Sequence, residues 1–134
     1  MPTIVYREVE VSTGEGKFAQ NISVGPHRLI ADEAAADGGD DRGPGPHEFL
    51  LIGLGACTSM TVKMYADRKG WPLGSVDVKV RGRRDDAEGF VVERDIHFVG
   101  DLDDEQRKRL LEIADKCPVH KTLTRSTKIS TRLV

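Results

Sequence analysis

The longest uncharged stretch of the chain lies near its centre, at residues 49–62, and contains no Asp, Glu, Lys or Arg. Charged residues make up 31% of the whole 134-residue sequence, so this stretch stands out clearly. It is shorter than the roughly 20 apolar residues that a helix needs to cross a bilayer. In a soluble protein, a segment that is apolar on nearly every side predicts a helix at the buried centre of the molecule.

Capping signals set the limits of this central helix. Pro46 suits the first helical turn, because its missing N–H would have no partner there. The helix is expected to run to Lys69 and to stop at Gly70. Gly53 and Gly55 lie inside it, where each costs about 1 kcal/mol relative to alanine. Either they allow close packing against another backbone, or the helix breaks there and restarts near Cys57.

Alternation of apolar and polar residues predicts strands elsewhere in the chain. An amino-terminal meander is expected at residues 4–11, 17–24 and 27–32, and a hairpin at residues 74–82 and 90–99. Within the last of these, Arg94 interrupts the apolar face. A second helix is expected to start from the capping pair Asp103 and Gln106, with an apolar stripe at Leu110, Ile113, Ala114 and Cys117. Residues 128–134 are expected to close the fold as a strand.

The predicted order is therefore βββ-α-ββ-α-β, which indicates an α+β fold in a single domain spanning residues 1–134. Antiparallel sheets are expected to pack around the central helix. Six short strands from one small chain do not cover such a helix on all sides. The pattern therefore favours an obligate homodimer, in which the central helices of two copies pack together.

Charge and composition exclude several classes of partner. Twenty basic residues against 22 acidic residues, with an isoelectric point near 6.1, create no field that would attract nucleic acid or an anionic membrane. The first ten residues contain no apolar core of a signal peptide. We therefore expect a cytoplasmic protein, with no nucleic-acid partner and no membrane partner.

Two cysteines are the main candidates for chemistry. Cys57 lies in the middle of the uncharged stretch, and Cys117 lies on the apolar stripe of the second helix. Free cysteines are commonly inert core residues. The small and hydroxyl-bearing neighbours of Cys57, which include Thr58 and Ser59, would equally leave room for a substrate. The pattern alone leaves both readings open.

Other chemistries fit the sequence less well. Cys57, Cys117 and His120, with His47 or His27, form an admissible zinc set, but their spacing matches no zinc ribbon or finger. A Cys-His nucleophile could use His120, but the sequence shows no Asn or Asp that would orient this histidine.

Two motifs together identify a known family. The segment GPGPHEFLLIGLGACTSMTVKMYADRKGWPL contains LGAC at residues 54–57, and DLDDEQRKRLLEIADKCPVHKTL contains CPVH at residues 117–120. With the basic strand between them and the closing strand, they resemble the OsmC/Ohr family of small bacterial peroxide-reducing proteins. The resemblance covers most of the chain. It implies an intertwined homodimer, with two sheets around the central helices and two active sites at the interface.

The resemblance also implies a mechanism. Cys57 would attack an organic hydroperoxide as the peroxidatic cysteine, and Cys117 would resolve the resulting sulfenic acid as a disulfide, which an external dithiol reduces. A pocket lined by Phe49, Leu50, His47 and His120 would hold the alkyl group. This chemistry needs no cofactor and no metal.

Activation of the thiol departs from the family pattern. Better-studied members of the family pair an arginine with a glutamate ten residues before the peroxidatic cysteine, whereas that position is His47 here and the acid is Glu48, a later place that some more distant members share. Nine residues of regular helix separate Glu48 from Cys57 by about 13.5 Å, so contact would require a break; otherwise Glu48 would cap the helix. Arg42 and Arg28 are the candidate arginines, and Arg42 is favoured because its loop leads into the helix.

A non-catalytic function is the alternative. The same interface pocket could bind a small apolar ligand, with the cysteines acting in packing or as a redox switch. Peroxide consumption in the presence of a dithiol separates the two hypotheses.

Overall fold

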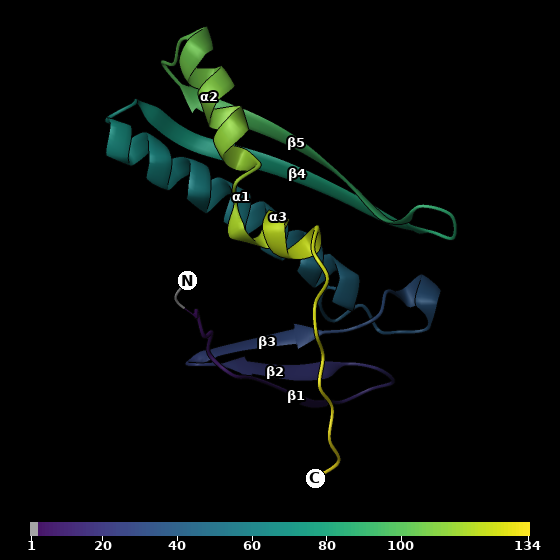
Figure 1. Cartoon of the computed structure of the whole chain (residues 1–134). Helices are drawn as coiled ribbons and strands as arrows, with labels where there is room; N and C mark the ends of the chain where they lie inside the picture. The colour runs from purple at the N-terminus through teal and green to yellow at the C-terminus, as the bar shows by residue number, and fades with distance from the viewer. Residues whose placement is uncertain (1–2) are drawn as a thin grey trace. The chain divides into compact units, whose positions relative to one another are not determined.

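The computed structural model describes residues 3–134 (Figure 1). The chain divides into two compact units, with the boundary between Leu50 and Leu51. The first unit contains a small sheet and the start of the central helix, and the second contains a long hairpin and the remaining helices. The α+β class and the antiparallel sheets with a central helix agree with the prediction.

The first unit is built on a three-stranded antiparallel sheet in the order β1-β2-β3. Its strands are β1 (Val9–Thr13), β2 (Gln20–Val24) and β3 (His27–Ala31). Gly25 makes the tight turn between β2 and β3 with a positive φ of 55°, which a glycine adopts without steric cost. The meander is therefore confirmed, although its first strand begins at Val9 instead of residue 4.

The loop after β3 is held by the buried carboxylate of Asp32, which is 2% exposed. Its two oxygens accept hydrogen bonds from the backbone N–H groups of Glu33, at 2.7 Å, and Arg42, at 3.1 Å. A short 3₁₀ helix, η1 (Ala35–Asp37), lies between these two contacts. The segment leading into the central helix is thus fixed by its own side chains.

The central helix, α1 (Pro46–Lys69), runs without interruption through Gly53 and Gly55. A Cβ atom on Gly55 would lie 3.3 Å from Val80 Cγ2, so this glycine permits close packing against a strand. The helix ends as expected at Gly70, whose φ is 68°, and Trp71 N–H donates to Ala66 O at 2.9 Å. Of the two explanations offered for the glycines, close packing applies at Gly55.

A long hairpin forms the sheet of the second unit. It pairs β4 (Leu73–Asp85) with β5 (Gly89–Gly100), in the register Val76↔Phe98, Val78↔Ile96 and Val80↔Arg94. Alternation puts the apolar residues of both strands on one face. That face packs against α1 and α2, whereas the other face is charged and exposed.

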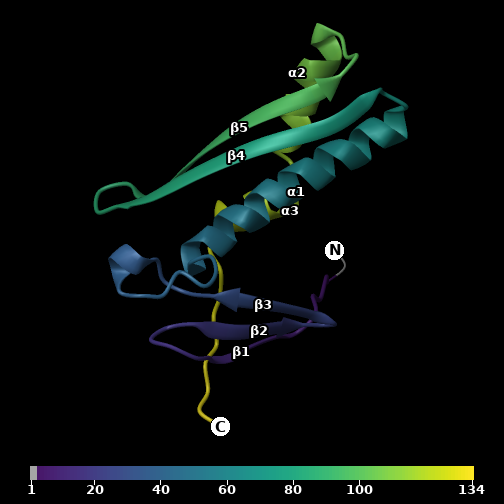
Figure 2. The same ribbon diagram turned by 180° about the vertical axis from the view of Figure 1, so that it is seen from behind.

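Helix α2 (Asp104–Ala114) completes the core of the second unit. Its amino terminus has the predicted capping box, in which Asp103 and Gln106 bond reciprocally at 2.8 and 2.9 Å. The core joins α1, the hairpin and α2 through Val62, Ala66, Leu73, Phe98, Leu102, Leu110, Ile113 and Ala114. A further short helix, α3 (Pro118–Leu123), was not predicted, and it lies beside α1 in both Figure 1 and Figure 2.

Two expectations from the sequence need correction. The predicted closing strand is wrong: in the described chain, residues 126–134 carry neither helix nor strand, because their alternating pattern finds no strand edge to pair with. The central helix is also less buried than predicted. Within one chain only Leu54, Thr58, Val62 and Ala66 of α1 are buried, while Ile52, Met60 and Met64 on the opposite side are exposed.

Candidate functional site

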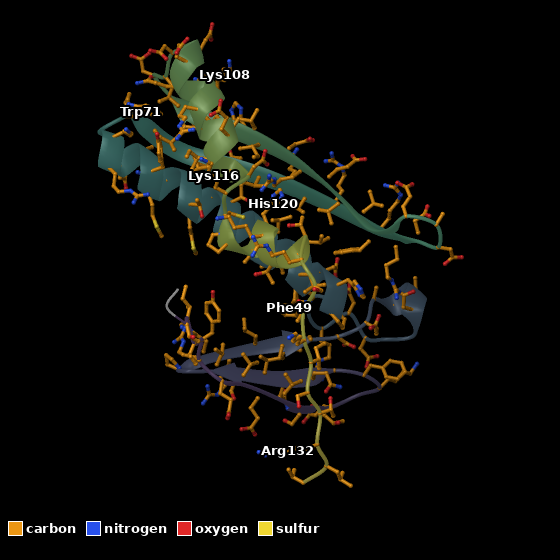
Figure 3. All side chains as sticks on the ribbon, in the orientation of Figure 1. Phe49, Trp71, Lys108, Lys116, His120 and Arg132 are labelled. Carbon is orange, nitrogen blue, oxygen red and sulfur yellow. The ribbon has the colours of Figure 1, made fainter. Side chains whose placement is uncertain are left out.

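The two cysteines lie in the second unit, Cys57 within α1 and Cys117 between α2 and α3, outside the helix on which the sequence pattern had placed it. Cys57 lies in the middle of α1 and is half-buried, with its Sγ 3.9 Å from Thr61 Oγ1. Cys117 is fully buried and occupies the position immediately before α3, where its Sγ accepts a hydrogen bond from His120 N–H at 3.3 Å. Both thiols are free. In Figure 3 the labelled residues Lys116 and His120 flank the position of Cys117 in the chain.

Thr58 connects the two cysteine segments. It follows Cys57 directly in α1, about 100° further round the helix, and its side chain is fully buried. Its hydroxyl donates to Leu54 O at 2.6 Å, one turn earlier in the same helix. The same oxygen lies 3.9 Å from Cys117 Sγ. The buried Thr58 hydroxyl therefore contacts both its own helix, α1, and the cysteine that precedes α3.

An arginine completes this cluster. Arg94 lies on the inward face of β5, and only 12% of its side chain is exposed. Its Nη1 donates to Thr58 Oγ1 at 2.9 Å and to Ala114 O at 3.2 Å, and its Nη2 donates to Asp115 Oδ1 at 2.6 Å. The sequence reasoning missed Arg94 as a site residue. The available signal was its place in the apolar face of a predicted strand, where a charge must find partners.

His120 lies at the edge of the same cluster. Its Nδ1 is 3.4 Å from Arg94 Nη2 and 3.9 Å from Asp115 Oδ1. An arginine only donates hydrogen bonds, so in the tautomer that bonds Arg94 the His120 Nδ1 accepts and Nε2 carries the proton. In this tautomer His120 can offer its Nε2–H to a bound molecule while its other nitrogen faces Arg94.

A pocket of about 570 Å³ opens beside this cluster within the second unit. Its walls are mostly apolar, with polar groups from Arg94, His120 and Thr124, and the remaining lining residues are Leu54, Phe90, Val91, Val92 and Leu123. The volume is in the range of small-molecule sites. Of the four residues expected to line a substrate pocket, His120 lines this one.

The other expected pocket residues lie in the first unit, at the start of α1. Phe49 is half-buried, and Leu50 is 43% exposed. His47 lies in the first turn of the helix and is exposed. Their place in a substrate pocket stays a prediction.

The expected activating residues also lie in the first unit, each with its own partners. Glu48 Oε1 accepts a hydrogen bond from Gly45 N–H at 2.8 Å, which caps the start of α1. Arg42 Nη1 lies 3.9 Å from Glu15 Oε2. Arg28 Nη1 donates to the carbonyls of Gly25 and His27 at 3.1 and 3.0 Å. Because α1 is unbroken, Glu48 and Cys57 of one chain are about 13.5 Å apart along its axis.

Potential metal ligands are not clustered among the described residues. Among residues 3–134, no group of three or more His, Cys, Asp or Glu side chains is placed to hold a metal ion. Cys57, Cys117 and His120, the members of the zinc set that belong to the second unit, form no such group.

Comparisons with known proteins agree with this fold. A family model described as "OsmC-like protein" matches residues 38–132. An OsmC-like protein from Mycoplasma pneumoniae has a similar structure, with a TM-score of 0.77 and 18% identity over 91% of this chain and 89% of that chain. An organic hydroperoxide resistance protein from Legionella pneumophila superposes with a TM-score of 0.67 and 16% identity, covering 91% of each chain.

The organic hydroperoxide resistance protein OhrB of Bacillus subtilis is also similar, with a TM-score of 0.63 and 21% identity over 88% of this chain and 90% of that chain. At these identities the solved structures establish the shared fold. No curated protein matches the sequence.

Proposed function

This chain belongs to the OsmC-like protein family, and on that premise we propose that it reduces organic hydroperoxides to alcohols with a pair of thiols. The observation that carries the proposal is the position of the two cysteines. Cys117 lies 3.9 Å from the hydroxyl of Thr58, the residue that follows Cys57 in α1. Two free thiols in adjacent elements of a small protein are the minimum that a disulfide-based reduction requires.

The reaction proceeds in three balanced steps. The Cys57 thiolate attacks the O–O bond of the hydroperoxide, and the departing alkoxide takes a proton and leaves as the alcohol, so that Cys57 becomes a sulfenic acid. The Cys117 thiol then displaces the sulfenic hydroxyl, forming an S–S bond and releasing water. A dithiol reductant finally exchanges with this disulfide, restores both thiols and is itself oxidised to a disulfide.

The pocket supports an alkyl hydroperoxide as the substrate in preference to hydrogen peroxide. Apolar walls would bury an alkyl group, which hydrogen peroxide lacks. The His120 Nε2–H could donate a hydrogen bond to a peroxide oxygen in this pocket. Arg42 and Glu48 belong to the proposal as residues that activate Cys57, with Phe49, Leu50 and His47 as further pocket residues.

We also propose that the active assembly is a homodimer in the cytoplasm, where a reducing environment keeps both cysteines free. By length and composition, α1 is long and apolar enough to cross a membrane. The central helices of soluble proteins share this property. The exposed apolar side of α1 supports packing against a second copy of the chain.

Intact-mass measurement tests the proposed function. One equivalent of cumene hydroperoxide should remove two hydrogens from the native protein, because an internal disulfide forms. The Cys57→Ser variant should not react, whereas Cys117→Ser should react once and accumulate a sulfenic acid that dimedone traps. An unchanged mass with both thiols still free would rule out the peroxidase function.

A non-catalytic ligand-binding function is the second candidate, and the 570 Å³ pocket favours it. In this case an environment-sensitive apolar dye would bind the double variant Cys57→Ser/Cys117→Ser as tightly as the wild type. The wild type would also leave cumene hydroperoxide unconsumed in the presence of dithiothreitol.

A further inference from the structure

The Arg94 side chain contacts the chain on both sides of Cys117. It bonds Ala114 and Asp115 before the cysteine and approaches His120 after it. The corner between α2 and α3, which carries Cys117, is therefore tied to β5 by one nearly buried guanidinium. A cation this buried needs all of these partners, because an unpaired charge would be costly at this site.

The bonds of Thr58 can be counted atom by atom. A hydroxyl has one proton to donate and two lone pairs that accept. The Thr58 proton is used by Leu54 O at 2.6 Å, and Arg94 Nη1 donates to one lone pair at 2.9 Å. The remaining lone pair is available at the contact with Cys117 Sγ, at 3.9 Å. The proton of that contact must therefore come from the Cys117 thiol.

Cys117 is consequently held in a defined orientation. Its S–H donates to Thr58, and its sulfur accepts from His120 N–H at 3.3 Å. Arg94 determines this orientation, because it donates a hydrogen bond to Thr58 Oγ1. That oxygen can then only accept a hydrogen bond from Cys117 Sγ.

We propose that Arg94 is a positioning residue for the resolving step, acting through Thr58 and the α2–α3 corner to present the Cys117 thiol to the oxidised Cys57. The inference rests on the proposed function. In this step the Cys117 sulfur bonds to the Cys57 sulfur, the sulfenic S–O bond breaks, and the thiol proton leaves with the hydroxyl as water. Because Arg94 also lines the proposed substrate pocket, the proposal concerns the rate of disulfide closure relative to the rate of the first step, the attack of Cys57 on the peroxide.

Arg107 provides a matched structural control. It is also a partly buried arginine that clasps backbone carbonyls, with bonds to Phe98 O and Gly100 O at 3.0 Å and to Leu102 O at 3.3 Å. These bonds secure the connection between β5 and α2, and none of them involves a cysteine. Arg107→Met should therefore lower stability without a selective effect on disulfide formation.

The experiment measures the two chemical steps separately. Protein is mixed with one equivalent of cumene hydroperoxide and quenched at intervals, with dimedone reporting sulfenic acid and intact mass reporting the disulfide. Relative to its own rate of sulfenic acid formation, Arg94→Met should close the disulfide at least about tenfold more slowly than the wild type, since a small misplacement of a reacting group costs this much or more. The sulfenic acid should therefore accumulate. Arg107→Met should close the disulfide at the wild-type rate.

Further variants separate positioning from folding. Arg94→Lys keeps the charge but cannot reach Thr58 and Asp115 together, so it should fold and restore the closing rate only in part. Thr58→Val should also slow disulfide closure. The double variant Arg94→Met/Thr58→Val should close little more slowly than either single variant, because Arg94 acts on Cys117 through Thr58. Circular dichroism confirms that each variant is folded at the temperature of the assay.

Specific outcomes would overturn the inference. The inference fails if both Arg94 variants close the disulfide at the wild-type rate. It also fails if they slow sulfenic acid formation and disulfide closure equally. Oxidation by diamide, which joins two nearby thiols without peroxide, distinguishes this failure from failure of the proposed function. If the wild type ignores peroxide but diamide closes its disulfide faster than that of Arg94→Met, the peroxidase function fails and the positioning role stands.

Discussion

At the scale of single residues, the candidate site depends on side chains that satisfy one another in a buried setting. Among the described residues, every buried side-chain nitrogen or oxygen has a hydrogen-bond partner. The Thr58 hydroxyl alone contacts three groups, from Arg94, Leu54 and Cys117. Its hydroxyl is therefore expected to matter for stability as well as for chemistry.

Replacing Thr58 tests this expectation. Thr58→Val keeps the shape but leaves a buried Arg94 N–H without its acceptor, which should lower the free energy of unfolding by about 1–3 kcal/mol. Thr58→Ser retains the hydroxyl and should lose less. Urea unfolding followed by circular dichroism gives both values. Equal stability of the two variants would show that the hydroxyl contributes nothing.

A second residue-scale prediction concerns the activation of Cys57. Arg28 already donates to two backbone carbonyls, whereas the contact of Arg42 with the 90% exposed Glu15 side chain is long, at 3.9 Å. The Arg42 guanidinium is thus the more available of the two to stabilise a thiolate. Arg42→Ala should slow iodoacetamide alkylation of Cys57 near neutral pH more than Arg28→Ala does. Identical rates in both variants and in the wild type would remove Arg42 from the site.

The sequence identified the two cysteines through short motifs, but it did not identify Arg94 as a site residue. Alternation placed Arg94 on the apolar face of its strand, where it looked like an interruption. Its partners come from the corner between α2 and α3, and α3 itself was not predicted. A strand pattern contains no information about which polar groups of distant segments will meet a buried charge.

At the scale of elements, local signals predicted both limits of α1 and the start of α2, but not the end of α2, which lies at Ala114 and leaves Cys117 outside the helix. Pro46, Gly70 and the Asp103–Gln106 pair act within a few residues of their own positions, so the sequence contains all that is needed. The prediction of a closing strand at residues 128–134 was wrong for the opposite reason. A strand requires hydrogen bonds from a neighbouring strand, and alternation in residues 128–134 does not supply one.

The turn of the β4–β5 hairpin gives an element-scale prediction of pH dependence. Asp85 Oδ1 accepts hydrogen bonds from the backbone N–H groups of Glu88, at 3.0 Å, and Ala87, at 2.8 Å, and these hold the pKa of the Asp85 carboxyl below its usual value. A lowered folded-state pKa stabilises the turn above the unfolded-state pKa, and this stabilisation is lost as pH falls through the folded value.

Amide hydrogen exchange at Ala87 and Glu88 measures this effect. Protection at these two amides, relative to their intrinsic exchange rates, should be constant around neutral pH and should fall in acid, below the ordinary pKa of an aspartate. Asp85→Ala should remove the protection at all pH values. Asp86→Ala serves as the control, and it should leave the pH profile of the turn unchanged. If amide protection in the wild type did not change with pH, the Asp85 carboxylate would not be what stabilises the turn.

At the scale of the whole molecule, one chain leaves a large apolar surface on its central helix. Ile52, Met60 and Met64 are each more than half exposed, at 51%, 59% and 60%, and they recur on one side of α1. The uncharged pattern of residues 49–62 predicted burial on nearly every side, and a single chain provides it for one stripe only. Periodicity shows that a surface must be covered, but it does not show which chain covers it.

The last prediction is that a second copy of the chain covers this side of α1. An obligate dimer that shares a core should bury more than the roughly 1,600 Å² of a standard interface. Met60→Glu would place a charge in that apolar contact and should dissociate the dimer, or unfold it, at micromolar concentration in sedimentation velocity. Leu111→Glu is the matched control: Leu111 is 55% exposed on α2, so a charge there should leave the dimer intact. A wild-type chain that sediments as a folded monomer, or a Met60→Glu variant that remains dimeric, would exclude this interface.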